Sequence, residues 1–234
     1  MTGSKPAQRV EDNHAAGHRE RLREKFRTAG PGALHDYELL ELLLFRAIPR
    51  RDVKPLAKRL MAEFDGLGGV LGADAALLQK TAGVSENVAT ELKIVAAAAE
   101  ALMRGAIRDR PVLSSWTALL DYCRATMSYG RVEEFRVFFL DNKNRLIADE
   151  VLQRGTINHT PVYPREVVKR ALEVGASSII LAHNHPSGDC TPSKADIAMT
   201  QTIIEAAKAL GVAVHDHLII GAGEHASFKS LGLL

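Results

Sequence analysis

The pattern of hydrophobic and polar positions divides the chain into a helical half and a mixed half. Between residues 15 and 104, leucine and alanine recur at helical spacing, and glycines such as Gly30 and Gly83 separate the segments. This pattern predicts several short α-helices and a last, alanine-rich helix that ends near Gly105. Residues 1–14 are polar and show no periodicity, so we expect a disordered tail there.

Beyond residue 115 the pattern becomes that of a domain with both strands and helices. The run Ser178–Ala182 is typical of a buried strand, and Glu134–Leu140 alternates and is rich in aromatic residues, as strands are. The predicted elements are, in chain order, a helix at 117–127, strands at 134–140 and 145–152, a helix at 164–174, a strand at 178–182, a helix at 193–210 and a strand at 212–220. We expect an α/β domain at 116–234, with helices on a curved mixed sheet, preceded by a linker at 105–115 and the helical domain at 15–104.

The predicted buried strand leads directly into two histidines that are separated by one residue. Successive strand residues point to opposite faces of the sheet, so His183 and His185 share a face. Pro186 ends the strand, and Asp196 follows in the next predicted helix. Two imidazoles and a carboxylate are a typical ligand set for a catalytic zinc ion, which leaves its fourth position to water.

Ser193 and Asp196 also fit a capping box, in which Ser193 begins a helix and Asp196 stands three residues on. The two interpretations are compatible, because a helix start would hold Asp196 rigidly near the end of the strand. Asp189 and Cys190 are alternative third ligands, although they lie in a loop that gives them no fixed direction toward the histidines.

The segment HNHPSGDCTPSKAD, at residues 183–196, resembles the JAMM motif of the JAB/MPN metallohydrolases: His-x-His, seven residues, Ser, two residues, Asp. The flanks, GTINHTPVYPREVVKRALEVGASSIILA and DHLIIGAGEHASF, resemble the bacterial RadC family more closely. The resemblance implies a JAB/MPN fold, a zinc cofactor and hydrolysis of an amide or isopeptide bond in a peptide or protein substrate. Tyr163 departs from many members of the family, which have His at this position.

A zinc hydrolase of this type needs a carboxylate that moves a proton from water to the leaving amine. The resemblance gives this role to Glu133, because the family pattern of Glu-x-Phe, an apolar strand and Leu-Asp begins at this residue. Glu134, one residue away and on the opposite face, is the alternative. The resemblance also implies that Ser193 donates a hydrogen bond to the developing oxyanion.

Further histidines lie outside the motif. His215 and His217 form a second His-x-His pair without a following carboxylate, and we expect half-buried strand histidines with satisfied ring nitrogens. Asp216 with His217 resembles a pair near the end of the family's domain, where a role in orienting a metal ligand fits. His159 lies in a turn and is expected to line the cleft.

The composition of the chain indicates the cellular compartment in which we expect the protein. The 234 residues include two cysteines, Cys123 and Cys190, which provide no disulfide framework. The polar N-terminus has no secretory signal, and no run approaches the roughly 20 apolar residues that a membrane-spanning helix needs. We therefore expect a cytoplasmic protein with no membrane partner.

The helical domain resembles helix-hairpin-helix modules, in which a Gly-x-Gly turn lets backbone N–H groups approach a phosphate. The matching turn, Gly83 to Ser85, lacks the second glycine, and the net charge of the chain is only +2. Basic clusters near Arg19 and Arg50 are best explained as solvated helix faces. A DNA-associated module is the alternative to the hydrolase, since the family's historical name links it to DNA repair. We expect at most weak, non-specific DNA binding, and a packing or homodimerisation role is at least as well supported.

Overall fold

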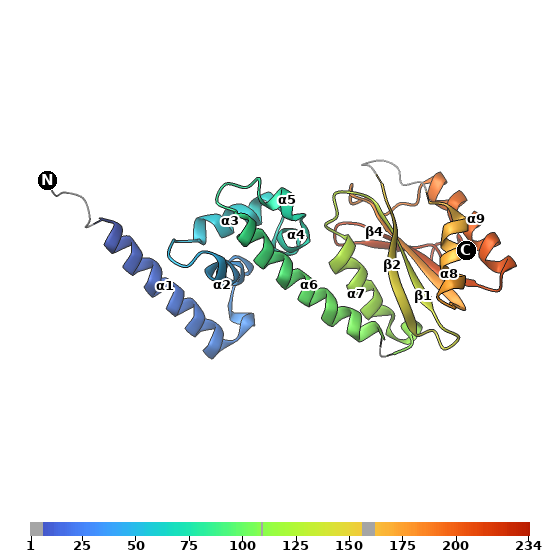
Figure 1. The fold of residues 1–234 in the computed structure, drawn as a ribbon, viewed down its shortest axis with the longest axis horizontal. Helices are drawn as coiled ribbons and strands as arrows, with labels where there is room; N and C mark the ends of the chain where they lie inside the picture. Colours follow the sequence, from blue (N-terminus) through green and yellow to red (C-terminus); the bar gives the residue numbers. More distant parts are fainter. Residues whose placement is uncertain (1–6, 109, 156–161) are drawn as a thin grey trace. The chain divides into compact units, whose positions relative to one another are not determined.

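The computed structural model describes residues 7–108, 110–155 and 162–234, with side chains from residue 17 onward. The chain forms two compact units, Met1–Ala98 and Ala99–Leu234 (Figure 1). The N-terminal unit contains the helices α1 (Ala7–Ala29), η1 (Pro31–Ala33), α2 (Asp36–Ala47), α3 (Lys54–Glu63), α4 (Leu67–Gly72), α5 (Ala75–Leu78) and the first part of α6 (Glu86–Arg108). None of the helices among the described residues is both long and apolar enough to cross a membrane.

The core of the N-terminal unit consists of the apolar faces that the helical spacing predicts. Leu40 and Leu44 of α2 and Leu60 of α3 are fully buried in it. Arg19 of α1 is also buried, and its guanidinium donates hydrogen bonds to the backbone oxygens of Ile48 and Arg51, at 2.5 and 2.7 Å. The arginine therefore ties α1 to the backbone that follows α2.

Two helices extend beyond the ranges that the sequence predicted. α1 begins at Ala7, inside the segment 1–14 that we expected to be a disordered tail. Nucleation is the costly step in helix formation, so an existing helix can propagate through a polar segment that has no apolar face of its own. α6 continues through Gly105 to Arg108, inside the expected linker, because Ile107 is fully buried in the core of the C-terminal unit. This packing overrides the low helix propensity of glycine.

The glycine-rich segment at 66–72, which we expected to be a turn-rich joint, contains the helix α4. Val70 of this helix is fully buried. A Cβ atom on Gly69 would lie 1.6 Å from the backbone oxygen of Phe64. The glycine therefore permits the close approach of two backbone segments and does not mark a turn.

The C-terminal unit is an α/β domain with a mixed five-stranded sheet. Its elements are η2 (Val112–Ser115), α7 (Trp116–Met127), β1 (Glu134–Leu140), β2 (Leu146–Arg154), α8 (Pro164–Glu173), β3 (Ser178–Asn184), α9 (Lys194–Ala209), β4 (Ala213–Ile220) and β5 (His225–Ser227). The strand order is β2-β1-β3-β4-β5, in which β3 and β4 are parallel and the other neighbours are antiparallel. The sequence predicted each of these strands except β5, which is too short to show a period.

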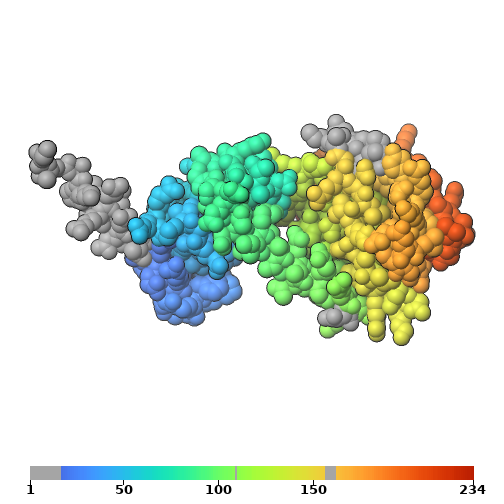
Figure 2. Space-filling model, in the orientation of Figure 1, coloured from blue at the N-terminus to red at the C-terminus, as the bar shows by residue number. Residues whose placement is uncertain are grey.

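The two faces of the sheet are covered by different helices. On β3, Ile180 and Ala182 lie in the same buried cluster as the apolar residues of α7. Ile179 and Leu181 point to the other face and pack in a second cluster with residues of α8 and α9. Figure 2 shows α8, in orange, at the surface of the unit. β3 is therefore buried on both sides, as a strand with a continuous apolar run should be.

The close approach at Gly69 can be tested by substitution. Gly69→Ala should lower the free energy of unfolding by about 1–3 kcal/mol, because backbone atoms must shift to admit the new methyl group. Gly105→Ala is the matched control, since a Cβ atom at this helical position meets nothing within 4 Å. It should stabilise the protein by up to about 1 kcal/mol. Urea unfolding followed by circular dichroism measures both effects, and equal stability of the two variants would contradict the packing role of Gly69.

Candidate metal centre

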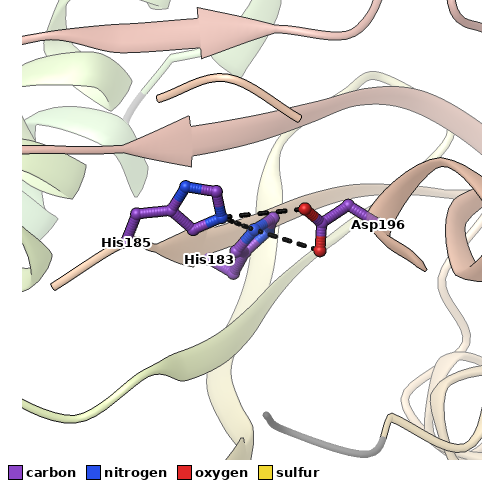
Figure 3. Close-up of side chains that lie close together, drawn as sticks. All are labelled: His183, His185 and Asp196. Atoms are coloured by element: carbon purple, nitrogen blue, oxygen red, sulfur yellow. Dashed lines mark hydrogen bonds and ion pairs between the residues drawn. The ribbon is translucent and has the colours of Figure 1, made fainter. Parts of the chain in front are cut away.

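Three side chains converge at the C-terminal end of β3 (Figure 3). The Nε2 atoms of His183 and His185 lie 2.9 Å apart. Asp196, in the first turn of α9, places Oδ1 at 3.5 Å from Nε2 of His183 and Oδ2 at 3.7 Å from Nε2 of His185. In the part of the chain that the structure describes, this is the group of histidine and acidic residues whose ligand atoms are close enough together to hold a metal ion.

The backbone at both ends of the site is fixed by hydrogen bonds. Directly after β3, the backbone N–H of His185 donates to the oxygen of Ile220 at the end of β4, at 2.9 Å. Ser193 and Asp196 form the capping box that their spacing predicts: the Asp196 N–H donates to Ser193 Oγ at 3.1 Å, and the Ser193 N–H donates to Asp196 Oδ2 at 2.8 Å. The cap and the ligand interpretation of Asp196 are thus compatible in the structure, because the cap holds the carboxylate toward the histidines.

The tautomer of His183 follows from a chain of buried hydrogen bonds. The Thr200 hydroxyl donates to the backbone oxygen of Asp196 at 2.6 Å, so its oxygen is left to accept from Nδ1–H of His217, also at 2.6 Å. Burial lowers the pKa of His217 well below its usual value, so that this ring is neutral. Its Nε2 then accepts the Nδ1–H of His183 at 2.7 Å. The remaining nitrogen of His183, Nε2, carries no hydrogen.

A different partner fixes the tautomer of His185. Its Nδ1 lies 2.5 Å from the backbone oxygen of Asp189, and a carbonyl oxygen can only accept a hydrogen bond. In the neutral ring the hydrogen therefore sits on Nδ1, and Nε2 is bare. Two nitrogen lone pairs thus face each other and a carboxylate at short range. This arrangement is repulsive unless a cation lies among the three groups, so the residues fit a metal ion.

Electrostatics at the site favours the same conclusion. Burial lowers the pKa of His183 to about 4, which keeps the ring neutral and available as a ligand. The hydrogen bond with Asp196 raises the pKa of His185. Burial raises the pKa of Asp196, but hydrogen bonds with His185 and Ser193 outweigh this effect and hold it below its usual value. The carboxylate is therefore charged at neutral pH and attracts a cation, for which a proton on His185 competes.

The structure places the two candidate bases differently. Glu133 is half-buried immediately before β1, and its negative charge contributes to the raised pKa of His185. Glu134 is the first residue of β1, and its carboxylate forms an ion pair with Nε of Arg154 at 2.9 Å. Glu133 is thus electrostatically coupled to the metal-binding cluster, whereas Glu134 is occupied by an arginine of the neighbouring strand.

The alternative third ligands lie elsewhere in the loop after β3. Asp189 orients His185 through its backbone oxygen, while its carboxylate accepts the backbone N–H of Thr191 at 2.9 Å. The half-buried thiol of Cys190 lies near the backbone oxygen of Gly188, and burial raises its pKa. Neither side chain belongs to the His183–His185–Asp196 group.

The second His-x-His pair divides into two separate roles. His217 is fully buried against His183, as expected for a residue that orients a ligand, whereas His215 pairs its Nε2 with Oδ1 of Asn144 at 2.7 Å. Sequence reasoning missed Thr200, which completes the chain from His217 back to Asp196. Its position four residues after Asp196, on the same side of a helix, is the signal that could have found it. His159 lies outside the described residues.

The basic residues of the N-terminal unit are largely engaged within the unit. Arg27 pairs with Glu20 and Glu24, at 2.7 and 2.6 Å, and Lys25 pairs with Glu38 at 2.7 Å.

A cavity of about 360 Å³ lies beside the Gly83–Ser85 turn. Its lining residues are Ala47, Ile48, Pro49, Arg50, Arg51, Gly83, Ser85 and Val88.

Comparisons with known proteins identify both parts of the chain. Residues 14–90 match the family described as UPF0758 N-terminal, and residues 113–233 match the RadC-like JAB domain. A UPF0758 protein from Rhodobacter capsulatus is 62% identical over 213 residues, which are 91% of this chain and 100% of that protein. The matched JAB domain includes the three residues of the candidate metal centre and the sheet that positions them. The chain therefore belongs to the RadC/UPF0758 family, with a UPF0758 N-terminal domain followed by a RadC-like JAB domain.

Proposed function

We propose that this protein is a zinc-dependent hydrolase that cleaves an amide or isopeptide bond in a peptide or protein. The observation that carries the proposal is the convergence of the Nε2 atoms of His183 and His185, 2.9 Å apart, on the carboxylate of Asp196. Nitrogen and carboxylate donors suit zinc, and catalytic zinc sites use three protein ligands with one open position. Membership of a JAB-domain family supports the hydrolase class.

Two residues of the chain would assist the metal ion in the reaction, one by proton transfer and one by stabilising the oxyanion. When bound, zinc supplies Lewis acidity, which makes water a nucleophile near neutral pH and polarises a carbonyl group. Glu133 accepts the proton that the attacking water loses and delivers it to the leaving nitrogen. Ser193 uses its oxygen to accept the N–H of Asp196 in the helix cap, so its hydroxyl hydrogen remains free to donate to the developing oxyanion.

A second candidate function, weak DNA binding by the N-terminal unit, is favoured by one feature. Arg50 and Arg51 are exposed and line the cavity beside the Gly83–Ser85 turn. Arginine side chains and backbone N–H groups are common phosphate contacts and carry no sequence preference. We propose that this turn and the two arginines bind a nucleic-acid backbone without sequence preference, with each arginine contacting one phosphate.

The zinc site makes a prediction about ligand charge. Purified protein should bind close to one zinc ion per chain, and Asp196→Asn should weaken binding at least about tenfold because it removes the anionic ligand. Asparagine retains an oxygen that can accept the N–H of Ser193, so the helix cap is preserved. Competition with a chromogenic chelator measures the affinity. Loss of zinc in Cys190→Ser, with full affinity in Asp196→Asn, would show that the third ligand is wrongly assigned.

The base makes a prediction about turnover. Glu133→Gln should retain zinc and the fold but lower the hydrolysis rate by a factor of about 10² or more, since proton transfer by a placed side chain contributes that much. Glu134→Gln is the matched control and should change the rate only slightly, because its carboxylate is paired with Arg154. A peptide and isopeptide library, read by mass spectrometry, provides the assay. The reverse order of the two effects would move the role to Glu134.

The DNA contact makes a prediction about salt dependence. The full chain should bind duplex DNA weakly, with a slope of log affinity against log salt of roughly −2, since each phosphate contact contributes about −0.9. The double variant Arg50→Ala, Arg51→Ala should abolish the binding, whereas Arg27→Ala should not, because its guanidinium is already paired with two glutamates. Fluorescence anisotropy measures these affinities. Tight, sequence-specific binding that survives the double substitution would contradict the proposal.

A further inference from the structure

Asn184 stands between the two metal-binding histidines, and its side chain points to the opposite face of β3. It is only 2% exposed. Its Oδ1 accepts the backbone N–H of Glu134 at 2.8 Å, and its Nδ2 donates to the backbone oxygens of Val132 and Gly130, at 3.1 and 3.3 Å. All three hydrogen bonds therefore go to the backbone of one segment, residues 130–134.

The asparagine continues the sheet at the point where the regular ladder ends. The pairing of β1 with β3 runs from Leu140 opposite Ser178 to Phe135 opposite His183. One residue further along, the side chain of Asn184 takes the N–H of Glu134 in place of a backbone carbonyl. A side-chain amide can do this because it offers an acceptor and two donors within one small group.

These hydrogen bonds hold the residues on both sides of Glu133. The residue before it, Val132, and the residue after it, Glu134, are each held by Asn184. The backbone oxygen of Glu133 accepts the N–H of Gly155 at 2.9 Å. The backbone that carries the Glu133 carboxylate is thus fixed to the strand that carries His183 and leads into His185.

The fit around the amide is close. A Cβ atom on Gly130 would lie 3.0 Å from Nδ2 of Asn184, so the segment approaches the amide as closely as a glycine allows. Without the amide, the Glu134 N–H and the carbonyls of Gly130 and Val132 lose three hydrogen bonds, each of which contributes about 0.5–1.5 kcal/mol. The segment would then be expected to move away from the sheet.

We propose that Asn184 is a positioning residue that sets the place of Glu133 relative to the metal-binding histidines. The inference rests on the proposed function, in which Glu133 is the general base. A displacement of about 1 Å in a reacting group can lower a rate by a factor of about 10². Because one residue of β3 holds the base while its neighbours bind the metal, the strand fixes both halves of the reaction centre.

The test compares Asn184→Leu with Ser178→Ala. Ser178 lies at the other end of β3, where its buried hydroxyl donates to Asn144 at 3.3 Å, so this control also removes a hydrogen bond from the strand. In Asn184→Leu, amide hydrogen exchange in residues 130–134 should accelerate at least about tenfold, because the bond to the Glu134 N–H is lost. Zinc affinity should stay within about threefold, since no ligand changes. Ser178→Ala should leave exchange in this segment unchanged.

The kinetic part of the test asks whether Asn184 acts through Glu133. The kcat of Asn184→Leu should fall at least about tenfold with little change in KM, as expected for a loss confined to the transition state. In a Glu133→Gln background the same substitution should cause no further loss, because the two changes then remove one function. If the leucine variant does not fold, Asn184→Ala replaces it, since alanine removes the acceptor and both donors without the bulk of leucine.

The outcomes separate the inference from the proposed function. Unchanged exchange in residues 130–134 would overturn the inference, whatever the activity. Loss of zinc together with faster exchange would also overturn it, because the residue would then act on the ligands. Faster exchange with retained zinc and a kcat effect that disappears in the Glu133→Gln background would support it. If the wild-type protein hydrolyses no substrate, the proposed function fails, and the exchange result alone decides whether Asn184 holds the segment.

Discussion

In their neutral forms, His183 and His185 present two Nε2 atoms without hydrogens to one carboxylate at the end of β3, and the rest of the domain holds these groups in place. The hydrogens of both rings are bound elsewhere, that of His183 by His217 and that of His185 by the backbone of Asp189. Each bond leaves the Nε2 atom of its ring as a free ligand. A cation bound between the two nitrogens would remove the repulsion between their lone pairs. The free energy of the fold and the affinity for metal are therefore linked.

The alternation of side chains along β3 determines where the metal-binding residues and Asn184 lie. Alternate residues of β3 point to opposite faces, so His183 faces α8 and α9 while Asn184 faces the segment that follows α7. Apolar neighbours such as Ile179 and Ile180 anchor both faces in packed cores. If the strand slipped by one residue, His183 and Asn184 would each point to the wrong face of the sheet. Such a slip would also expose the apolar side chains of the strand. Register, stability and site geometry thus depend on the same alternation.

Much of the C-terminal domain could be predicted from local pattern. The His-x-His spacing placed His183 and His185 on one face, and the capping box at Ser193 and Asp196 was correct because both signals are local in sequence. The role of His217 was expected only from the resemblance to the family, and the contact of Thr200 with His217 depends on the register of α9 against β4, which local pattern does not give. The same holds for Asn184, whose partners lie about fifty residues earlier in the chain.

The helical half was harder to predict because glycine has more than one role. Gly69 permits a close contact inside a core, and Gly105 lies within a helix that tertiary packing extends, although both residues resemble breaks in the sequence. Composition alone gives no means of separating these cases from a true turn such as Gly83, which has a positive φ of 98°.

The most direct measurement of the central claim is nitrogen-15 NMR of the histidine rings during zinc titration. The hydrogen-bond network predicts that His183 and His185 both keep their hydrogen on Nδ1 and that zinc shifts the Nε2 resonances of these two residues. His217 should keep its hydrogen on Nδ1 without binding the metal. A zinc-induced shift at Nδ1 of either ligand, or no shift at all with one equivalent of zinc, would contradict the arrangement on which the proposed function depends.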